Sequence, residues 1–286
     1  MHMRQTPEWY DRMYNNRAWV PDFANHLQHW TEQSKTARHQ LRGLTDISYG
    51  DGPNENLDIF PANLAHAPVM VFLHGGYWRA LDKSDQSFIA PSFTREGVCA
   101  VVPNYALCPM VTIPDIVMQM VKALTWVWRY ISEWGGDPSR IHVVGHSAGG
   151  HLAAMMMACQ WQRYADDLPA DLVKSGLSVS GLFELESVMR SPMLQSDLRL
   201  DEAQVLRCSP AWMPTPAQGS FWSVVGALES DEFIRQHMLI QQAWGKACVP
   251  VCEALPGLHH FNVLSALAES GSYLNRLALR FLHGVM

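Results

Sequence analysis

The chain of 286 residues is poor in charged side chains and has no cluster of positive ones. Aspartate, glutamate, lysine and arginine make up 17% of the residues, and the formal net charge is −6. Nucleic acids and anionic membranes are bound through clustered lysine and arginine, so the sequence predicts neither partner. The hydrophobic content of 48% is typical of a globular protein and excludes a disordered chain.

Long apolar segments are also lacking. No uninterrupted apolar stretch is long enough to cross a bilayer, so no membrane partner is expected. The first eight residues, MHMRQTPE, have no apolar core like that of a signal peptide. These features predict a cytoplasmic protein.

Cysteine is scattered rather than arranged in pairs, which indicates reduced, partly buried thiols and agrees with a cytoplasmic location. Cys248 and Cys252 are four residues apart, but no second cysteine or histidine pair stands at zinc-ligand spacing, so no metal is expected. The sequence contains neither Gly-x-Gly-x-x-Gly nor a phosphate-binding loop, and no cofactor is predicted. The six cysteines are Cys99, Cys108, Cys159, Cys208, Cys248 and Cys252.

Short apolar runs alternate with helical segments along the whole chain, without an internal repeat or a low-complexity linker. This alternation predicts one α/β domain over residues 1–286, with a mostly parallel central sheet covered by helices on both faces. A turn signal at 50–54 predicts a β-hairpin between 47–49 and 57–60. Further strands are expected at 69–73, 98–102, 141–144, 177–180, 223–226 and 249–254. Helices are expected at 84–96, 114–134, 148–159, 231–244 and 273–282.

Two segments stand outside this alternation. Residues 7–42 predict two helices, 7–18 and 21–42, that are too aromatic to form a free tail. We expect them to pack on the body of the protein, where they could serve as a lid over the active-site mouth. The stretch 182–218 mixes helix, loop and proline, and it predicts a cap-like insertion above the strand ends that shapes a pocket.

The most informative motif is Gly-His-Ser-Ala-Gly around Ser147, which directly follows the apolar run 141–144 and opens a helical stretch. A sharp turn from strand to helix exposes a serine hydroxyl at a helix N-terminus, where developing negative charge is stabilised. The motif therefore predicts that Ser147 is a catalytic nucleophile.

A second glycine motif follows the strand expected at 69–73, namely His74-Gly75-Gly76-Tyr77-Trp78. Its position is that of the His-Gly-Gly-Gly loop of lipases and esterases, whose backbone N–H groups bind an oxyanion. This correspondence predicts an oxyanion hole formed by the N–H groups of Gly76, Tyr77 and Ala148. Gly75 would shape the loop beside the substrate, and His74 would brace it by hydrogen bonding.

The serine also needs a histidine base and a carboxylate that orients it, in the chain order serine, acid, histidine. Glu229 follows the strand expected at 223–226 and is the favoured acid, while Asp231 remains the alternative. His260 is the favoured base, and the adjacent His259 is assigned to the surface or a supporting position. His146 and His151 are interpreted as packing or hydrogen-bonding residues.

The sequence resembles the α/β-hydrolase superfamily and, within it, the group of kynurenine formamidases (arylformamidases) and related esterases. The resemblance implies the α/β-hydrolase fold and hydrolysis of an aryl formamide, an aryl amide or a small ester by Ser147, Glu229 and His260. Where formamidases often carry aspartate as the acid, this chain has glutamate. The resembling stretches are 56–60, 74–78, 103–107, 145–151, 229–233 and 260–261, and the segment 14–18 looks like that of bacterial members.

We therefore expect a small-molecule aryl amide or ester as the substrate. Candidate walls of its pocket are Trp78, Trp212 and Trp222, together with Phe221 and the N-terminal aromatic residues. Two alternatives stay open, a carboxylesterase for short acyl esters with the same catalytic residues and a non-catalytic ligand-binding member of the fold. A homodimer also stays open.

Overall fold

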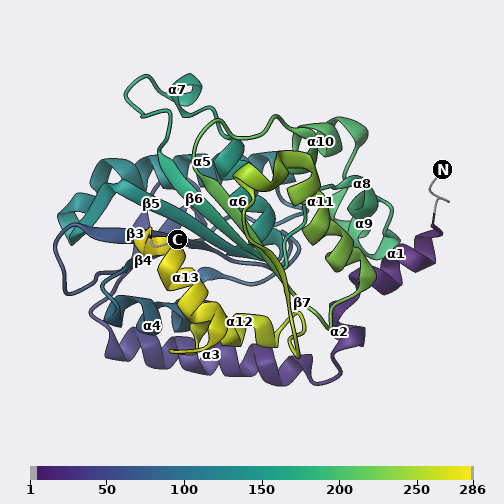
Figure 1. Ribbon diagram of the computed structural model, residues 1–286, viewed down its shortest axis with the longest axis horizontal. Helices are drawn as coiled ribbons and strands as arrows, with labels where there is room; N and C mark the ends of the chain where they lie inside the picture. Colours follow the sequence, from purple (N-terminus) through teal and green to yellow (C-terminus); the bar gives the residue numbers. More distant parts are fainter. Residues whose placement is uncertain (1–4, 285–286) are drawn as a thin grey trace.

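The computed structural model, which describes residues 5–284, shows a twisted sheet between two layers of helices (Figure 1). Within these residues the strand order is β1-β2-β4-β3-β5-β6-β7-β8. Strands β3 to β8 all run parallel to one another, and β2 pairs antiparallel with both β1 and β4. The mostly parallel sheet and the N-terminal hairpin are thus confirmed. The strands are β1 Leu44–Ser48, β2 Asn56–Phe60, β3 Ala67–Leu73, β4 Cys99–Pro103, β5 Gly136–His146, β6 Val173–Val179, β7 Ser220–Gly226 and β8 Cys252–Leu255.

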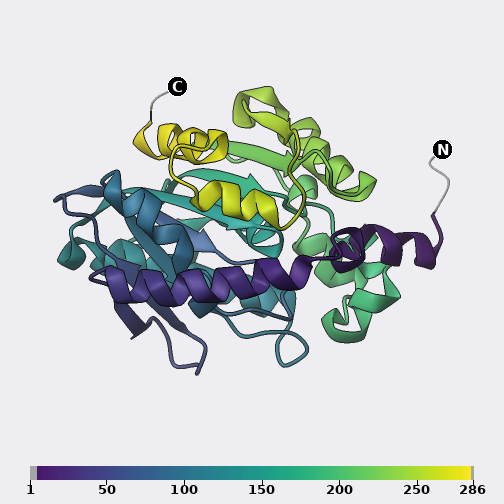
Figure 2. The same ribbon diagram turned by 90° about the horizontal axis from the view of Figure 1, so that it is seen from below.

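Both faces of the sheet are buried because apolar side chains point to either side of its central strands. In β3, Val69, Val71 and Leu73 belong to one hydrophobic cluster, whereas Met70 and Phe72 belong to the other. Three helices cover the first cluster: α5 Ile113–Tyr130, α6 Ala148–Ala158 and α11 Asp231–Cys248. The opposite face carries α3 Phe23–Gln40, α4 Ala90–Arg95, α12 Asn262–Ala268 and α13 Tyr273–His283 (Figures 1 and 2).

The predicted cap contains the short helices α8 Glu186–Met189, α9 Pro192–Leu198 and α10 Glu202–Arg207. The first helix of the chain, α1 Pro7–Tyr14, packs against α8, α9 and α11, which lie side by side in Figure 1. It is followed by α2 Asn16–Trp19 and then by α3, which runs along the other face of the sheet. Residues 7–40 therefore contact both the cap and the body of the protein. Among residues 5–284, no helix combines the length and apolarity needed to cross a membrane.

Several predicted boundaries were wrong for identifiable reasons. The helix expected at 7–18 ends at Tyr14, because Asn15 leaves the helical region and its side chain caps α2 by accepting from the N–H of Ala18. The helix expected at 84–96 is two 3₁₀ turns, 83–85 and 87–89, followed by α4, since Pro91 cannot donate to the carbonyl of Ser87. Pro250 likewise has no N–H to donate within a sheet, so the last strand begins at Cys252 rather than at Val249. The helix α12 and the short helix α7 Trp161–Tyr164 were not predicted.

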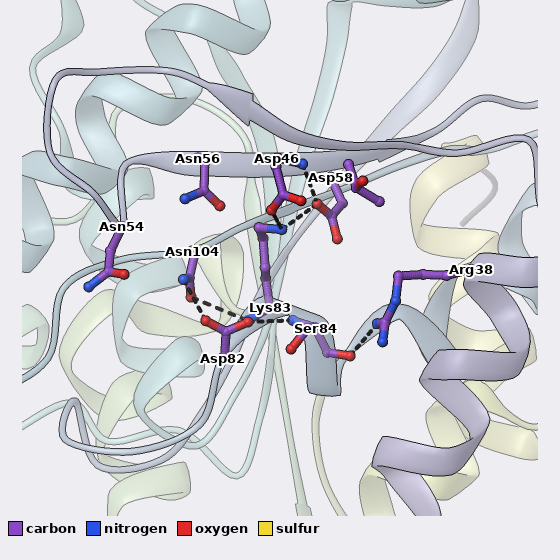
Figure 3. Close-up of a pocket in the computed structure, with 10 residues that line it drawn as sticks. Arg38, Asp46, Asn54, Asn56, Asp58, Asp82, Lys83, Ser84 and Asn104 are labelled. Atoms are coloured by element: carbon purple, nitrogen blue, oxygen red, sulfur yellow. Dashed lines mark hydrogen bonds and ion pairs between the residues drawn. The ribbon is translucent and has the colours of Figure 1, made fainter.

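A buried ion pair joins the antiparallel edge of the sheet to the turn after β3 (Figure 3). Lys83 is 4% exposed, and its Nζ donates to Asp46 of β1 at 2.7 Å and to Asp58 of β2. Asp58 is 1% exposed and also accepts from the backbone N–H of Asp46. The ammonium of Lys83 therefore neutralises the carboxylate of Asp58, which is buried and shielded from water.

We predict that Lys83→Met destabilises the protein by about 3–5 kcal/mol, because the charge of Asp58 is left buried without a partner. Urea unfolding of the variant and the wild type measures the difference. Lys174→Met is the matched control, since both partners of the Lys174–Asp171 pair are partly exposed and the pair should contribute no more than about 1 kcal/mol. Equal losses in the two variants would contradict the prediction.

Candidate active site

Ser147 lies at a sharp turn between β5 and α6, with φ 56° and ψ −121°. The surrounding backbones approach so closely that only glycine fits. A Cβ on Gly145 would stand 2.0 Å from the carbonyl oxygen of Gly149, and one on Gly149 would stand 1.9 Å from that of Leu73. The backbone N–H of Ser147 donates to Val179 of the neighbouring strand at 2.9 Å. The turn is therefore held rigidly in a conformation that L residues rarely adopt.

The structure brings the three predicted catalytic side chains into one hydrogen-bonded chain. The Oγ atom of Ser147 is 3.1 Å from Nε2 of His260, and Nδ1 of His260 is 2.6 Å from Oε2 of Glu229. All three residues are buried. This is the arrangement that a serine nucleophile, a base and an orienting carboxylate require.

Glu229 is fixed by contacts of its second carboxylate oxygen. Oε1 accepts from the hydroxyl of Ser180 at 2.5 Å and from the backbone N–H of Gly226 at 2.8 Å. The alternative acid, Asp231, is exposed at the first position of α11. Geometry therefore favours Glu229 as the partner of the histidine.

His260 is positioned from two sides. Nε2 of His146 donates to the backbone carbonyl of His260 at 2.9 Å, and the ring of Phe233 lies 4.6 Å from the imidazole. Burial, and then the neighbouring His260, lower the pKa of His146 well below its ordinary value, so its ring stays neutral. His259 instead accepts from the backbone N–H groups that follow it and packs against His26. The adjacent histidines therefore have different surroundings, and only His260 reaches the serine.

The glycine loop after β3 lies directly against Ser147. A Cβ on Gly75 would be 3.0 Å from Cβ of Ser147. Gly76, Tyr77 and Trp78 follow with φ of 105°, 50° and 54°. Among the described residues, the N–H groups of Gly76 and Tyr77 have no hydrogen-bond partner, and Ala148 is the first residue of α6, whose N–H has no intrahelical acceptor. Three free donors therefore lie on segments that meet at the serine.

His74 and Tyr105 brace this loop from below. Nδ1 of His74 donates to the carbonyl of Gly75 at 2.9 Å, which is the bracing contact expected for this residue. The two rings stack with centroids 4.1 Å apart, and the hydroxyl of Tyr105 donates to the carbonyl of His74 at 2.8 Å. Burial lowers the pKa of His74, which favours a neutral structural residue over a second base.

Ser147 and His260 open into a pocket of about 450 Å³. Its walls come from the N-terminal segment, the glycine loop, the cap and the turn after β8. The lining residues are Tyr14, Asn15, Asn16, Arg17, Leu27, Trp30, Gly76, Tyr77, Arg79, Ala80, Leu81, His146, Ser147, Met193, Asp197, His260 and Phe261.

The expectation that Trp78, Trp212 and Trp222 line the pocket was wrong. Trp78 is buried beneath the loop, with its ring 5.0 Å from that of His151. Trp222 points to the other face of the sheet, because side chains alternate along β7, and it packs under α13. Trp212 is half-exposed on a 3₁₀ turn, η4 Pro210–Trp212, outside the lining. Phe221 is likewise buried in the core against Trp244, away from the pocket.

Sequence reasoning missed two groups of residues at this site. The N-terminal aromatic residues predicted as walls include Tyr14 and Trp30, which line the pocket, but Asn16 and Arg17 line it too and had no predicted role. Sequence reasoning also placed Ser180 at the end of a strand without a role, where the structure shows it bonded to Glu229. The signal available for Ser180 was its position at the carboxyl end of a strand in a parallel sheet, where catalytic residues collect.

A separate polar hollow of about 270 Å³ lies around the Lys83 ion pair and contains none of the predicted catalytic residues (Figure 3). It is lined by charged and amide side chains that bond largely to one another. Within the part of the chain that the structure describes, no group of three or more His, Cys, Asp or Glu residues is arranged to hold a metal ion.

Known proteins resemble this chain over most of its length. A family model named BD-FAE matches residues 57–179, the stretch that contains the glycine loop and Ser147. The kynurenine formamidase of Drosophila melanogaster is 33% identical over 265 residues, covering 87% of each chain. That of Salmo salar is 27% identical over 269 residues, covering 90% of this chain and 88% of the relative.

Solved structures extend the likeness to three dimensions. A protein from Silicibacter sp. TM1040, provisionally named a thioesterase, superimposes with a TM-score of 0.82 at 29% identity. The match covers 96% of this chain and 98% of that protein. The sheet order, the hydrogen-bonded serine, histidine and glutamate, and the match to formamidases over most of both chains lead to one conclusion. This chain is a hydrolase with the α/β-hydrolase fold and belongs to the kynurenine formamidase family.

Proposed function

We propose that this protein hydrolyses an aryl formamide through an acyl-enzyme on Ser147. The observation that carries the proposal is the pair of hydrogen bonds that links Glu229 to His260 and His260 to Ser147. These residues lie at the floor of a pocket with aromatic walls. The chain belongs to the kynurenine formamidase family, which supports a formyl group as the acyl group transferred to Ser147.

In the first half-reaction, Nε2 of His260 accepts the proton of Ser147 as Oγ attacks the formyl carbon. Glu229 accepts from Nδ1 of His260 and stabilises the imidazolium that forms. The carbonyl oxygen becomes an oxyanion, bound by the N–H groups of Gly76, Tyr77 and Ala148. The imidazolium then protonates the nitrogen, the C–N bond breaks, and the arylamine leaves.

In the second half-reaction, a water molecule gives its proton to His260 and attacks the formyl-enzyme. The same N–H groups bind the second oxyanion. The bond to Oγ breaks, the imidazolium returns its proton to Ser147, and formate leaves. An arylamine is a better leaving group than an alkylamine, so these groups suffice without further activation.

The pocket walls suit an aryl leaving group. Tyr14, Trp30, Tyr77 and Phe261 contribute aromatic surface next to Ser147, and Leu27 adds an aliphatic contact. A volume of about 450 Å³ accommodates a substituted benzene ring. Burial of that ring supplies binding energy that does not depend on the acyl group.

The charged residues of the pocket favour a substrate with an amino-acid tail. Arg79 and Asp197 form an ion pair at 2.6 Å, and Arg17 has no carboxylate partner among the described residues. The guanidinium of Arg17 lies over the ring of Phe23 at 5.1 Å, which leaves its N–H groups free for an incoming carboxylate. Asp197 offers a partner for an ammonium group in the same pocket.

Esters of short acids are also expected to react, because an alkoxide or phenoxide leaves more readily than an arylamine from the same tetrahedral intermediate. A carboxylesterase is thus the second candidate function, since the same serine, histidine and glutamate serve it.

The first prediction concerns the substrate. We expect kcat/KM for N-formylkynurenine to exceed that for p-nitrophenyl acetate, and Ser147→Ala to lower both by at least about 10⁴-fold while the circular dichroism spectrum is unchanged. Steady-state kinetics on one preparation measures this. Turnover of the ester alone would exclude the formamidase and leave the esterase, and turnover by Ser147→Ala would exclude the mechanism.

The second prediction concerns the acid. Glu229→Gln should lower kcat by about 10³–10⁴-fold, because the amide cannot stabilise the imidazolium. Asp231→Asn is the matched control and should stay within about twofold of the wild type, since Asp231 is exposed. The larger loss in Asp231→Asn would show that the acid is assigned to the wrong carboxylate.

The third prediction concerns the tail of the substrate. Arg17→Gln should raise KM for N-formylkynurenine about threefold to tenfold, the worth of one exposed charge-assisted hydrogen bond, with KM for p-nitrophenyl acetate unchanged. Arg207→Gln, an exposed arginine on α10, serves as the control for lost surface charge. A parallel rise in KM for the uncharged ester would argue against a carboxylate contact.

A further inference from the structure

The hydroxyl of Tyr77 is held by the N-terminal segment of the chain. It donates to the backbone carbonyl of Tyr14 at 2.8 Å and accepts from Nδ2 of Asn16 at 3.3 Å. Tyr77 also lies edge-to-face with the ring of Tyr14, with centroids 6.3 Å apart. A residue of the glycine loop is thus bonded to a segment more than sixty positions earlier in the chain.

This loop needs such contacts because its backbone is strained. Gly76, Tyr77, Trp78 and Leu81 all have positive φ, and three of them carry a side chain. Conformations of this kind persist only where the surroundings over-determine them. The carbonyl of Trp78 accepts from the N–H of Cys108 at 2.8 Å, but this bond holds the loop beyond Tyr77.

Further along, the loop is tied to the cap. Arg79 donates to Asp197 at 2.6 Å and to the carbonyl of Met193 at 2.8 Å. Before Tyr77, the brace formed by His74 and Tyr105 holds the start of the loop. Among the described residues, the side-chain hydrogen bonds of Tyr77 itself come from the N-terminal segment alone.

The N-terminal segment is itself firmly anchored at this point. Tyr14 is fully buried, and its hydroxyl is 2.6 Å from Oγ of Ser187 in the cap and donates to Glu232 of α11 at 3.0 Å. Its ring lies edge-to-face with Phe233, whose other neighbour is the imidazole of His260. Tyr14 therefore joins the cap, α11 and the glycine loop at one buried position.

We propose that Tyr14 and Asn16 form a clamp on Tyr77 that aims the backbone N–H of Tyr77 at the oxyanion. Tyr77 is then a positioning residue through its side chain as well as a donor through its backbone. The inference rests on the proposed hydrolysis at Ser147, but it holds for any acyl substrate that forms an oxyanion there.

The physical reason is the rigidity of the tyrosine side chain. Its ring moves only through two torsions, so fixing the hydroxyl restricts the position of Cα and hence the direction of the N–H. Misplacing a catalytic group by about 1 Å lowers a rate by on the order of 10²-fold, and losing an oxyanion donor lowers it by 10²–10³-fold. Releasing the hydroxyl of Tyr77 from its hydrogen bonds leaves the backbone N–H present but free to tilt. The rate should therefore fall by less than it does when an oxyanion donor is lost.

Tyr77→Phe tests the clamp, because it removes the hydroxyl and leaves the ring and the backbone N–H. We expect kcat for p-nitrophenyl acetate to fall about tenfold with KM within twofold. Affinity for a trifluoromethyl ketone, whose adduct with Ser147 carries an oxyanion, should fall by the same factor. Asn16→Ala should lower both about threefold, since it removes the longer of the two hydrogen bonds.

Tyr49→Phe is the matched control. Tyr49 is buried, and its hydroxyl also donates to a backbone carbonyl, that of Asn104, at 2.6 Å. This variant should lose thermal stability comparably but keep kcat and inhibitor affinity. An equal fall in kcat in both variants, an unchanged kcat in Tyr77→Phe, or a fall in kcat without a fall in inhibitor affinity would each overturn the clamp.

The ester substrate separates this inference from the proposed function. If the wild type cleaves p-nitrophenyl acetate and not N-formylkynurenine, the formamidase proposal fails while the test of the clamp remains valid. If the formamide is cleaved and Tyr77→Phe matches the wild type on both substrates, the clamp alone fails.

Discussion

The carbonyl of Leu73 and the backbone of Gly149 lie so close that a Cβ on the glycine would be 1.9 Å from the oxygen. This approach joins the end of β3 to the first turn of α6, and the rest of the site depends on it. The glycine loop continues directly from Leu73, and Ser147 stands two residues before Gly149. A larger residue at either glycine of the turn would separate the proposed oxyanion donors from Ser147, because neither backbone could stay where it is.

His260 and Glu229, the proposed base and acid, reach this point from the ends of other strands in the parallel part of the sheet. The carboxyl ends of parallel strands meet at one edge, so the turns after β6, β7 and β8 bring Ser180, Glu229 and His260 to the same place as Ser147. The hydrogen bond from His146 to the carbonyl of His260 then ties the turn after β8 to the serine turn. The proposed catalytic residues are thus held by backbone contacts between strand ends and by the hydrogen bonds between their side chains.

The cap and residues 7–40 complete the pocket that the sheet leaves open. They contribute aromatic and charged lining residues, including Tyr14, Arg17 and Asp197, and they hydrogen-bond to the strained loop. In the proposed mechanism the same residue serves selectivity and catalysis. Tyr77 lines the pocket and contacts the N-terminal segment with its hydroxyl, and its N–H is the proposed oxyanion donor.

Local patterns in the sequence were sufficient to predict the elements whose geometry depends on neighbouring residues. The glycines around Ser147, the loop after β3 and the order of Ser147, Glu229 and His260 are of this kind, because close backbone turns and strand ends leave a local signature. The pocket walls were predicted only in part, because Tyr14 and Trp30 of the aromatic N-terminal segment line the pocket but the other expected walls do not. Tyr14 contacts residues 63 and 218 positions away in the chain, whereas the three tryptophans expected as walls proved to face the core, the far side of the sheet or solvent. The direction of a side chain is decided by strand alternation and by packing between distant segments, and these contacts exist only in the tertiary structure.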